Sequence, residues 1–373
     1  MYIGLDIGTS GTKASLIQPD GTVLRNAQIS YGFCNTRDGC RELDPKEVWK
    51  VVTECLKKAG KDMPVKTITV SSLGEAMVPV NPQGEPLSVS ITGTDQRGTD
   101  ELAYLVRAAG REHLTDVTGL NLSTIYSANK LLWIRRNQPE LFKRTWKFMT
   151  FQDYVVYRLS GTAVIDYSMA SRTMLFALSD LDWSEELLKA AGLERKLLST
   201  PVPAGTVAGS IRKELAEELG LPPDVKIVAG THDHICNALG CGVAEKGSCA
   251  DTVGTTEGLT AVLTREQLSS EEIEKYQISC EPFAVKGLYN TVAWNNTSGV
   301  LLKWFVTEFA RDEKKEGLTK AFARMNQEMK PEPTGLLVLP HFSGAATPYM
   351  DSASKGVILG LTLDTKREEV YKA

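Results

Sequence analysis

Apolar and polar positions alternate with two different periods along this chain, and both periods occur in its first sixty residues. Short apolar runs, several of them β-branched, predict strands at residues 2–7, 14–17, 22–29, 65–71 and 225–229. Apolar residues at helical spacing predict helices at residues 45–55, 99–110, 127–137, 151–159 and 184–191. The first half of the chain is therefore predicted to be mixed α/β.

A short internal repeat indicates how the chain is organised. The segment that begins Ile7-Gly8-Thr9-Ser10 recurs as Val253-Gly254-Thr255-Thr256, and a second apolar run follows each copy. Both copies predict a strand, a small polar turn and another strand, so we expect two related domains at residues 1–244 and 245–373. Gly-Thr turns join strands in many proteins, so coincidence stays open as the alternative.

Size and composition narrow the class of protein. A chain of 373 residues exceeds the size at which one hydrophobic core keeps growing, which again favours two domains. Its 42% hydrophobic and 24% charged residues are typical of a folded enzyme. A net charge of −4 provides no excess of cations for a nucleic acid, so a small-molecule partner is expected.

Membrane insertion and disulfide bonding are not expected from the sequence. The start has no basic leader, and no uncharged apolar run approaches the roughly 20 residues of a membrane span. The chain is therefore expected to be cytoplasmic. Its seven cysteines are an odd number and are scattered, so a disulfide framework is not expected.

The run DIGTSGTK at residues 6–13 carries the first candidate chemistry. A turn of small residues exposes backbone N–H groups that bind anions, while hydroxyls add donors and a lysine adds positive charge. The candidate phosphate-binding residues are Gly8, Thr9, Ser10, Thr12 and Lys13, and Asp6 suits magnesium held through water. The alternative is an ordinary glycine-rich hairpin that Asp6 caps. A P-loop is rejected because the Lys-Ser/Thr ending is absent.

With these and further runs in the same order, the chain resembles the FGGY carbohydrate kinases. The matching runs lie at residues 71–75, 91–97, 127–133, 166–173, 335–340, 347–348 and 356–361. The resemblance implies an α/β fold of the two-domain actin-like ATPase (ribonuclease H-like) type. It also implies a phosphotransferase that moves the γ-phosphate of ATP, with Mg²⁺, to an alcohol group of a sugar, ketose or polyol.

Asp233 is the catalytic residue that the resemblance implies. It follows the predicted strand 225–229 and precedes an expected helix near Ile235, a usual place for a catalytic residue on an α/β sheet. In the family, an aspartate at this position takes the proton from the attacking sugar hydroxyl. The structural alternative is that Asp233 caps the helix that follows it.

The resemblance places Glu75, Asp95 and Arg97 at the substrate, because carboxylates accept from vicinal hydroxyls and an arginine donates in a fork. His232 and His234 are expected in the same pocket, although isolated residues of all these types are more often solvated or structural. His232, His234, Cys236 and Cys241 do not have the spacing of a zinc site. Gly93 stands where many relatives carry a tryptophan and Gly74 where glycerol kinases carry an arginine, so the substrate is left open.

The second turn, Gly254, Thr255 and Thr256, is expected to be a second phosphate loop. Thr252 occupies the position that corresponds to Asp6, so this loop is expected to bind phosphate without holding a metal. Thr255 satisfying its own turn is the structural alternative.

Family members usually continue for a hundred or more residues beyond the segment at 356–361, so a truncated chain with an incomplete second domain and nucleotide site is expected. The alternative function is a catalytically incomplete sugar-binding or regulatory protein, and a third reading is an actin-like ATPase without a sugar. A pentulose such as xylulose is the first expected substrate, with glycerol, erythritol or gluconate behind it. A homodimer is also expected.

Overall fold

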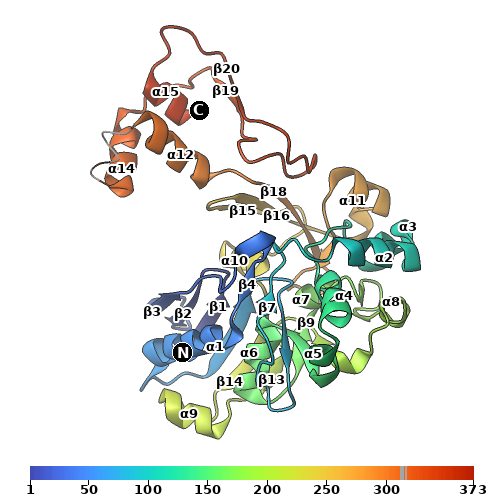
Figure 1. The fold of residues 1–373 in the computed structure, drawn as a ribbon. Coiled ribbons are helices and arrows are strands. Elements are labelled where there is room, and N and C mark those ends of the chain that lie inside the picture. Colours follow the sequence, from blue (N-terminus) through green and yellow to red (C-terminus); the bar gives the residue numbers. More distant parts are fainter. Residues whose placement is uncertain (311–314, 316) are drawn as a thin grey trace. The chain divides into compact units, whose positions relative to one another are not determined.

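The structure is a computed structural model that describes residues 1–310, 315 and 317–373, and it divides into two compact units (Figure 1). Unit 1 comprises residues 1–248, 262–274 and 279–290, and unit 2 comprises 249–261, 275–278 and the described residues from 291 to 373. Two segments beyond residue 248 thus belong to unit 1. The domain division at residues 244 and 245 stays a prediction.

A six-stranded sheet forms the centre of unit 1, in the order β13-β14-β5-β1-β2-β3. β1 pairs in parallel with β5, and β5 pairs in parallel with β14, whereas the other neighbours are antiparallel. The strands are β1 (Tyr2–Ile7), β2 (Gly11–Ile17), β3 (Val23–Ser30), β5 (Thr67–Ser72), β13 (Val207–Ser210) and β14 (Lys226–His232). The five strands expected from the sequence all lie in this sheet, each within a few residues of its predicted bounds.

The two faces of this sheet differ because side chains alternate along each strand. β1 buries Ile3, Leu5 and Ile7 on one face, where α1 (Pro45–Gly60) and α6 (Phe151–Ser160) pack. Asp6 therefore points to the opposite face. The two helices also contact each other, since the rings of Trp49 and Tyr154 lie 6.4 Å apart.

Local signals explain where α1 begins. Asp44 is its N-cap and accepts the Lys46 backbone N–H at 2.9 Å, while Pro45 occupies the first helical position without a donor to lose. Its buried residues recur at helical spacing, as expected from the sequence.

A second core in unit 1 joins helices to the small sheet β4-β7-β6-β8. The elements here are β4 (Glu42–Leu43), β6 (Met77–Val80), β7 (Ser90–Ile91), β8 (Lys147–Thr150), α2 (Thr99–Ala109), α3 (Arg111–Thr118), α4 (Ser127–Asn137) and α5 (Pro139–Arg144). Next come β9 (Val164–Asp166), α7 (Tyr167–Ser171), β10 (Phe176–Ala177), β11 (Asp182–Trp183), α8 (Glu185–Ala191), β12 (Thr200–Val202), α9 (Lys213–Leu219) and α10 (Asp233–Gly240).

The later elements include a four-stranded sheet in the order β15-β16-β18-β17. These elements are β15 (Cys249–Val253), β16 (Glu257–Leu263), α11 (Ser270–Tyr276), β17 (Glu281–Pro282), β18 (Tyr289–Asn295), α12 (Gly299–Phe309), α14 (Leu318–Glu328), β19 (Leu337–Leu339), β20 (Val357–Leu359) and α15 (Arg367–Lys372). Single 3-10 turns lie at Arg37–Gly39, Arg195–Leu197 and Arg265–Gln267.

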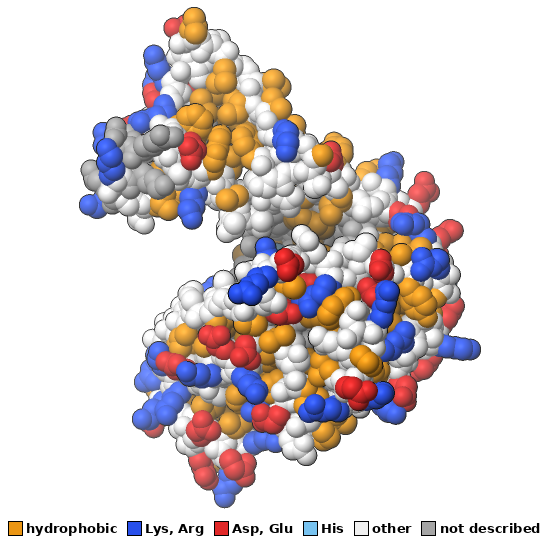
Figure 2. Space-filling view, viewed as in Figure 1, with side chains coloured by type: hydrophobic (Ala, Val, Ile, Leu, Met, Phe, Trp, Pro, Cys, Tyr) orange, Lys and Arg blue, Asp and Glu red, His pale blue; other side chains and the backbone are white. Residues whose placement is uncertain are grey.

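Apolar side chains remain exposed in the β19–β20 hairpin of unit 2, where Leu337 is 70% and Leu359 is 58% exposed. On the face shown in Figure 2, apolar side chains gather around this region, whereas charges of both signs are interspersed over unit 1. Among the residues that the structure describes, no helix has both the length and the apolar character to cross a membrane.

One buried carboxyl group in α6 makes stability depend on pH. Asp153 is fully buried and accepts hydrogen bonds from the hydroxyls of Thr150 and Ser199, both at 2.5 Å. Burial raises its pKa to about 7, although both hydroxyls oppose the shift. Between the ordinary pKa of an aspartate and about 7, the native state keeps a proton on Asp153 that the unfolded chain has already released. The free energy of unfolding therefore falls as the pH rises through this range.

Asp153→Asn should remove this dependence, because an amide cannot ionise and the hydroxyls can reorient to it. Urea unfolding should show that, from pH 5 to pH 8, the free energy of unfolding falls by roughly 2–3 kcal/mol more in the wild type than in the variant. Asp224→Asn, an exposed position, is the control and should behave as wild type. Equal pH dependence in wild type and Asp153→Asn would contradict the assignment.

Candidate active site

Three parallel strands, β1, β5 and β14, end at the same edge of the central sheet. The turn at residues 8–11 follows β1, Glu75 lies just beyond β5, and Asp233 comes directly after β14. Because parallel strands place their carboxyl ends together, segments far apart in sequence converge at this edge. Ligands of α/β proteins usually bind there.

The β1–β2 turn offers main-chain and hydroxyl groups without bulky side chains. The Gly8 N–H donates to the Gly11 carbonyl at 2.9 Å, and Thr9 and Ser10 are exposed. Thr12 differs from them, because its buried hydroxyl lies 3.2 Å from that of Tyr31, which donates to the Gly8 carbonyl at 2.7 Å. Thr12 therefore supports the turn from inside, and its hydroxyl is already engaged.

Asp6 lies beside this turn, opposite Lys13 in the β1–β2 register. Burial raises the pKa of Asp6, the Asp233 carboxylate raises it further, and Lys13 lowers it. Two acids that repel each other create a place where a cation is favoured. A single carboxylate beside a turn of exposed hydroxyls suits a magnesium ion that takes most of its ligands from water and phosphate oxygens. Among the described residues, no group of three His, Cys, Asp or Glu side chains is arranged for a metal.

Asp233 is the first residue of α10, and His232 occupies the N-cap position. Because His232 holds the N-cap position, Asp233 is not the N-cap that the structural alternative required, and its Oδ1 accepts the His234 backbone N–H at 2.7 Å. Its side chain is 35% exposed. Burial raises its pKa, while His234 and Arg172 oppose the shift, and a more basic carboxylate is better suited to accept a proton.

The two histidines stack beside this carboxylate, with ring centroids 5.3 Å apart. The His232 Nε2 lies 3.4 Å from the Asp233 Oδ1, and its backbone N–H donates to the Ser168 hydroxyl at 3.0 Å. Burial, and then the charges of Arg172 and His234, lower the pKa of His232 well below its ordinary value. The His232 ring is therefore neutral.

Glu75 has an unusual backbone conformation for a non-glycine residue, with φ at 63°. Left-handed residues other than glycine are costly and are often kept at functional sites. Its carboxylate pairs with the Arg172 guanidinium, which also donates to Glu281 at 2.8 Å. Burial raises the pKa of Glu75 and Arg172 lowers it, with a net rise.

Asp95 and Arg97 form an adjoining cluster. Asp95 is buried and accepts the Arg41 backbone N–H at 2.6 Å and two guanidinium bonds from Arg97, which also pairs with Glu42 at 2.6 Å. Although burial opposes it, these bonds keep the pKa of Asp95 below its ordinary value. The structure thus brings Glu75, His232 and Asp233 together and engages Asp95 and Arg97 with each other.

Sequence reasoning missed two residues of the site, Arg172 and Glu281. Arg172 stands within the 166–173 run, so its place in that run was a usable signal. No sequence signal pointed to Glu281, whose side chain is 1% exposed, because a lone acid between Cys280 and Pro282 forms no recognisable pattern.

The departures at Gly74 and Gly93 have a steric reason. A Cβ at Gly74 would lie 2.8 Å from the Arg172 Nε and 2.9 Å from the His232 Nε2, and one at Gly93 would lie 2.9 Å from a Glu75 oxygen. Both positions therefore leave room for the Glu75–Arg172 pair.

The second hairpin belongs to unit 2. The Gly254 N–H donates to the Thr256 carbonyl at 2.9 Å, and Gly254, Thr255 and Thr256 are exposed. The start of α12 packs on this turn through the main chain, since the Gly299 N–H donates to the Gly254 carbonyl at 2.8 Å. A Cβ at Gly299 would meet that carbonyl at 2.6 Å.

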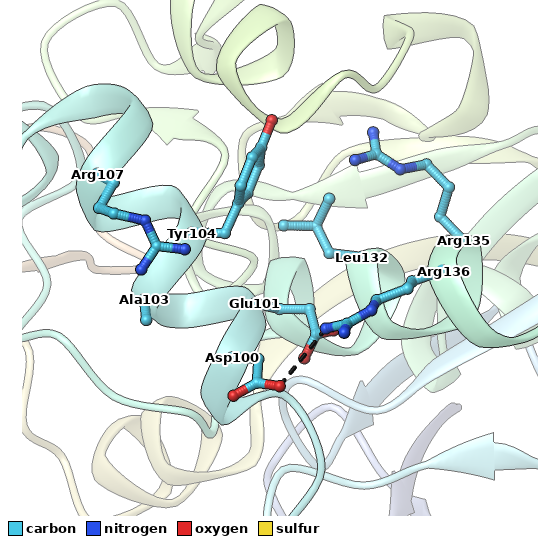
Figure 3. A pocket seen from close by; sticks show the side chains of 8 residues that line it. All are labelled: Asp100, Glu101, Ala103, Tyr104, Arg107, Leu132, Arg135 and Arg136. Carbon is cyan, nitrogen blue, oxygen red and sulfur yellow. Dashed lines mark hydrogen bonds and ion pairs between the residues drawn. The ribbon is translucent and has the colours of Figure 1, made fainter.

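A surface pocket of about 630 Å³ between α2 and α4 contains none of the predicted site residues (Figure 3). Two of the three arginines that line it have partners, because Arg136 pairs with Asp100 at 3.4 Å and Arg135 donates to the Gly192 carbonyl at 2.9 Å. We assign it no role in the reaction.

Sequence comparison matches two consecutive domains of one family. Residues 1–240 match the N-terminal domain, and residues 249–373 the C-terminal domain, of the FGGY family of carbohydrate kinases. Gluconokinase of Bacillus subtilis (strain 168) is 28% identical, over 100% of this chain and 73% of the relative. Xylulose kinase of Staphylococcus xylosus is 24% identical, over 100% of this chain and 76% of the relative.

Solved structures confirm the expected fold class. Ligand-bound xylulose kinase and gluconate kinase, both from Lactobacillus acidophilus, give TM-scores of 0.85 and 0.84 at 25% identity, each over 100% of this chain and 74% of the other. These matches extend over all residues of this chain and over 73–76% of each of these similar proteins, and the expectation of a truncated chain stays a prediction. The chain belongs to the FGGY family of carbohydrate kinases, with a two-domain actin-like ATPase fold, and it is a phosphotransferase that uses an alcohol group as acceptor.

Proposed function

We propose that the chain transfers the γ-phosphate of ATP to a hydroxyl of a sugar or polyol, with Asp233 as the general base. The position of Asp233 carries this proposal. It follows β14 at the sheet edge, interacts electrostatically with Asp6 and Glu75, and has a pKa raised by burial.

The proposed chemistry needs little from the protein except placement and charge. Asp233 accepts a hydrogen bond from the acceptor hydroxyl and directs its oxygen toward the γ-phosphorus. As that oxygen bonds to phosphorus, the bond from phosphorus to the β,γ-bridging oxygen breaks, and ADP leaves with the electron pair. The hydroxyl proton passes to Asp233.

The two hairpins are the proposed phosphate loops. In unit 1, Thr9, Ser10 and Lys13 would donate to phosphate oxygens, while Gly8 gives the phosphate room to approach and Thr12 supports the turn. In unit 2, Thr255 and Thr256 would donate, and Gly254 would leave the same room. Asp6 would hold magnesium through water. The ion, when bound, supplies charge that neutralises phosphate oxygens.

Glu75 is the proposed acceptor of substrate hydroxyl bonds, with His232 and His234 beside it. Asp95 and Arg97 are proposed to act on the substrate from the adjoining cluster, and Lys130 links the two groups. Its Nζ donates to the Asp95 carbonyl at 2.7 Å, and its charge interacts with Glu75. A homodimer and a cytoplasmic location stay predictions.

Asp233→Asn should lower sugar-dependent ADP production by about 10²- to 10⁴-fold in kcat, because the amide cannot accept the proton. A coupled assay with a panel of ketoses and polyols measures this. Asp224→Asn is the matched control, because it makes the same substitution at an exposed position. Wild-type turnover in Asp233→Asn would contradict the assignment of Asp233 as the general base.

Gly11→Ala should raise the KM for ATP about tenfold with little change in the KM for sugar. The added Cβ would lie 2.8 Å from the Ile29 carbonyl oxygen, so the turn must move. Gly4→Ala, also in the hairpin, meets nothing within 4 Å and is the control. A folded Gly11→Ala protein with an unaltered KM for ATP would exclude this turn as the phosphate loop.

A further inference from the structure

The pairing of Arg172 gives information about which acceptors the site can take. Arg172 follows α7, its side chain is 13% exposed, and its guanidinium carbon lies 5.8 Å from the centre of the Tyr126 ring. It pairs with Glu75 on one side and with Glu281 on the other. The Glu75 side chain is 12% and the Glu281 side chain 1% exposed, and the guanidinium is shared between these two acids.

Glu281 is fully engaged in this arrangement. Its Oε1 accepts from the Arg172 Nη1 at 2.8 Å and from the Ser279 hydroxyl at 2.6 Å. Although it follows residue 248 in the sequence, its segment, residues 279–290, belongs to unit 1. Glu281 does not need to contact the acceptor, since it acts through Arg172.

Negative charge is in excess at this site. Among the described residues, Asp6, Glu75, Asp233 and Glu281 form a chain of interacting carboxylates in which Arg172 is the guanidinium. The two lysines nearby serve other groups, because Lys130 donates to the carbonyls of Asp95 and Arg97, and Lys13, opposite Asp6 in the β1–β2 register, is assigned to phosphate. His232 adds no charge, because burial lowers its pKa.

We propose that the acceptor is an uncharged polyol or ketose, and that sugar acids are excluded because Glu281 neutralises the only guanidinium beside Glu75 among the described residues. This inference rests on the proposed function and adds the class of substrate. The carboxylate of an acid would lose water beside acids of the same sign, without a free guanidinium to bind it. Neutral hydroxyls, in contrast, can donate to these carboxylates.

Gluconokinases are among the similar proteins, so the choice between neutral and acidic acceptors distinguishes this chain within its family. A site for an aldonate would leave Arg172 free to form a two-pronged bond with the substrate carboxylate. The contacts of Arg172 with Glu75 and Glu281 make that bond unavailable here.

The test compares matched acceptors that differ in charge: xylitol with xylonate, glucitol with gluconate, and fructose with 2-ketogluconate. ADP production by the wild-type chain should give kcat/KM about 100-fold or more higher for the preferred neutral compound than for its acid. An acid used as well as its neutral partner would overturn the inference while leaving the kinase assignment intact. Failure of every acceptor would overturn the proposed function and this inference with it.

The variant Glu281→Gln tests whether Glu281 sets the preference for neutral over acidic acceptors. Removing this charge should leave Arg172 paired with Glu75 alone, so the kcat/KM ratio of neutral to acid acceptors should narrow by about tenfold, whereas a purely structural loss would lower both rates together. Glu271→Gln, an exposed position in α11, is the control and should keep the wild-type ratio. An unchanged ratio in a folded Glu281→Gln protein would show that Glu281 does not set it, and if the variant does not fold, the wild-type ratio decides the proposal.

Discussion

The parallel pairing of β1, β5 and β14 is the constraint on which the rest of the site depends. It brings the ends of three strands to one edge, and residues 8–11, Glu75 and Asp233 follow those ends. The apolar residues on one face of β1 hold the sheet against α1 and α6, which leaves Asp6 on the other face. A one-residue slip in β1 would turn Asp6 into the core, so packing of the buried face fixes the position of the acid.

The site combines a high density of acids with limited space. Burial raises the pKa of Asp6, Glu75 and Asp233, and each also feels the charge of a neighbouring acid or of Arg172. Gly74 and Gly93 leave space beside the Glu75–Arg172 pair, because a Cβ at either position would lie within 3.0 Å of one of these two side chains. From the sequence, these two glycines only made the choice of substrate uncertain. In the structure, they leave space for a charged pair.

The family's C-terminal segment contributes to unit 1 as well as to unit 2. Residues 262–274 and 279–290 fall within the 249–373 match yet belong to unit 1, where Leu263, Ile273 and Cys280 pack with Leu178. Burial of these apolar residues fixes the segment that carries Glu281. The position of Glu281 therefore depends on packing between parts of the chain about a hundred residues apart in sequence.

The sequence by itself determined the fold class, the five strands of the central sheet, the main helices, the two glycine-containing hairpins and the family. These features depend on local periodicity and on runs of neighbouring residues, which a sequence displays directly. Only the tertiary structure decided that Thr12 is buried against Tyr31, that Arg97 pairs with Glu42, and that Arg172 joins Glu75 to Glu281. Those facts depend on which distant side chains meet in a buried space, where pairing and desolvation set charge, and no local pattern encodes such a meeting.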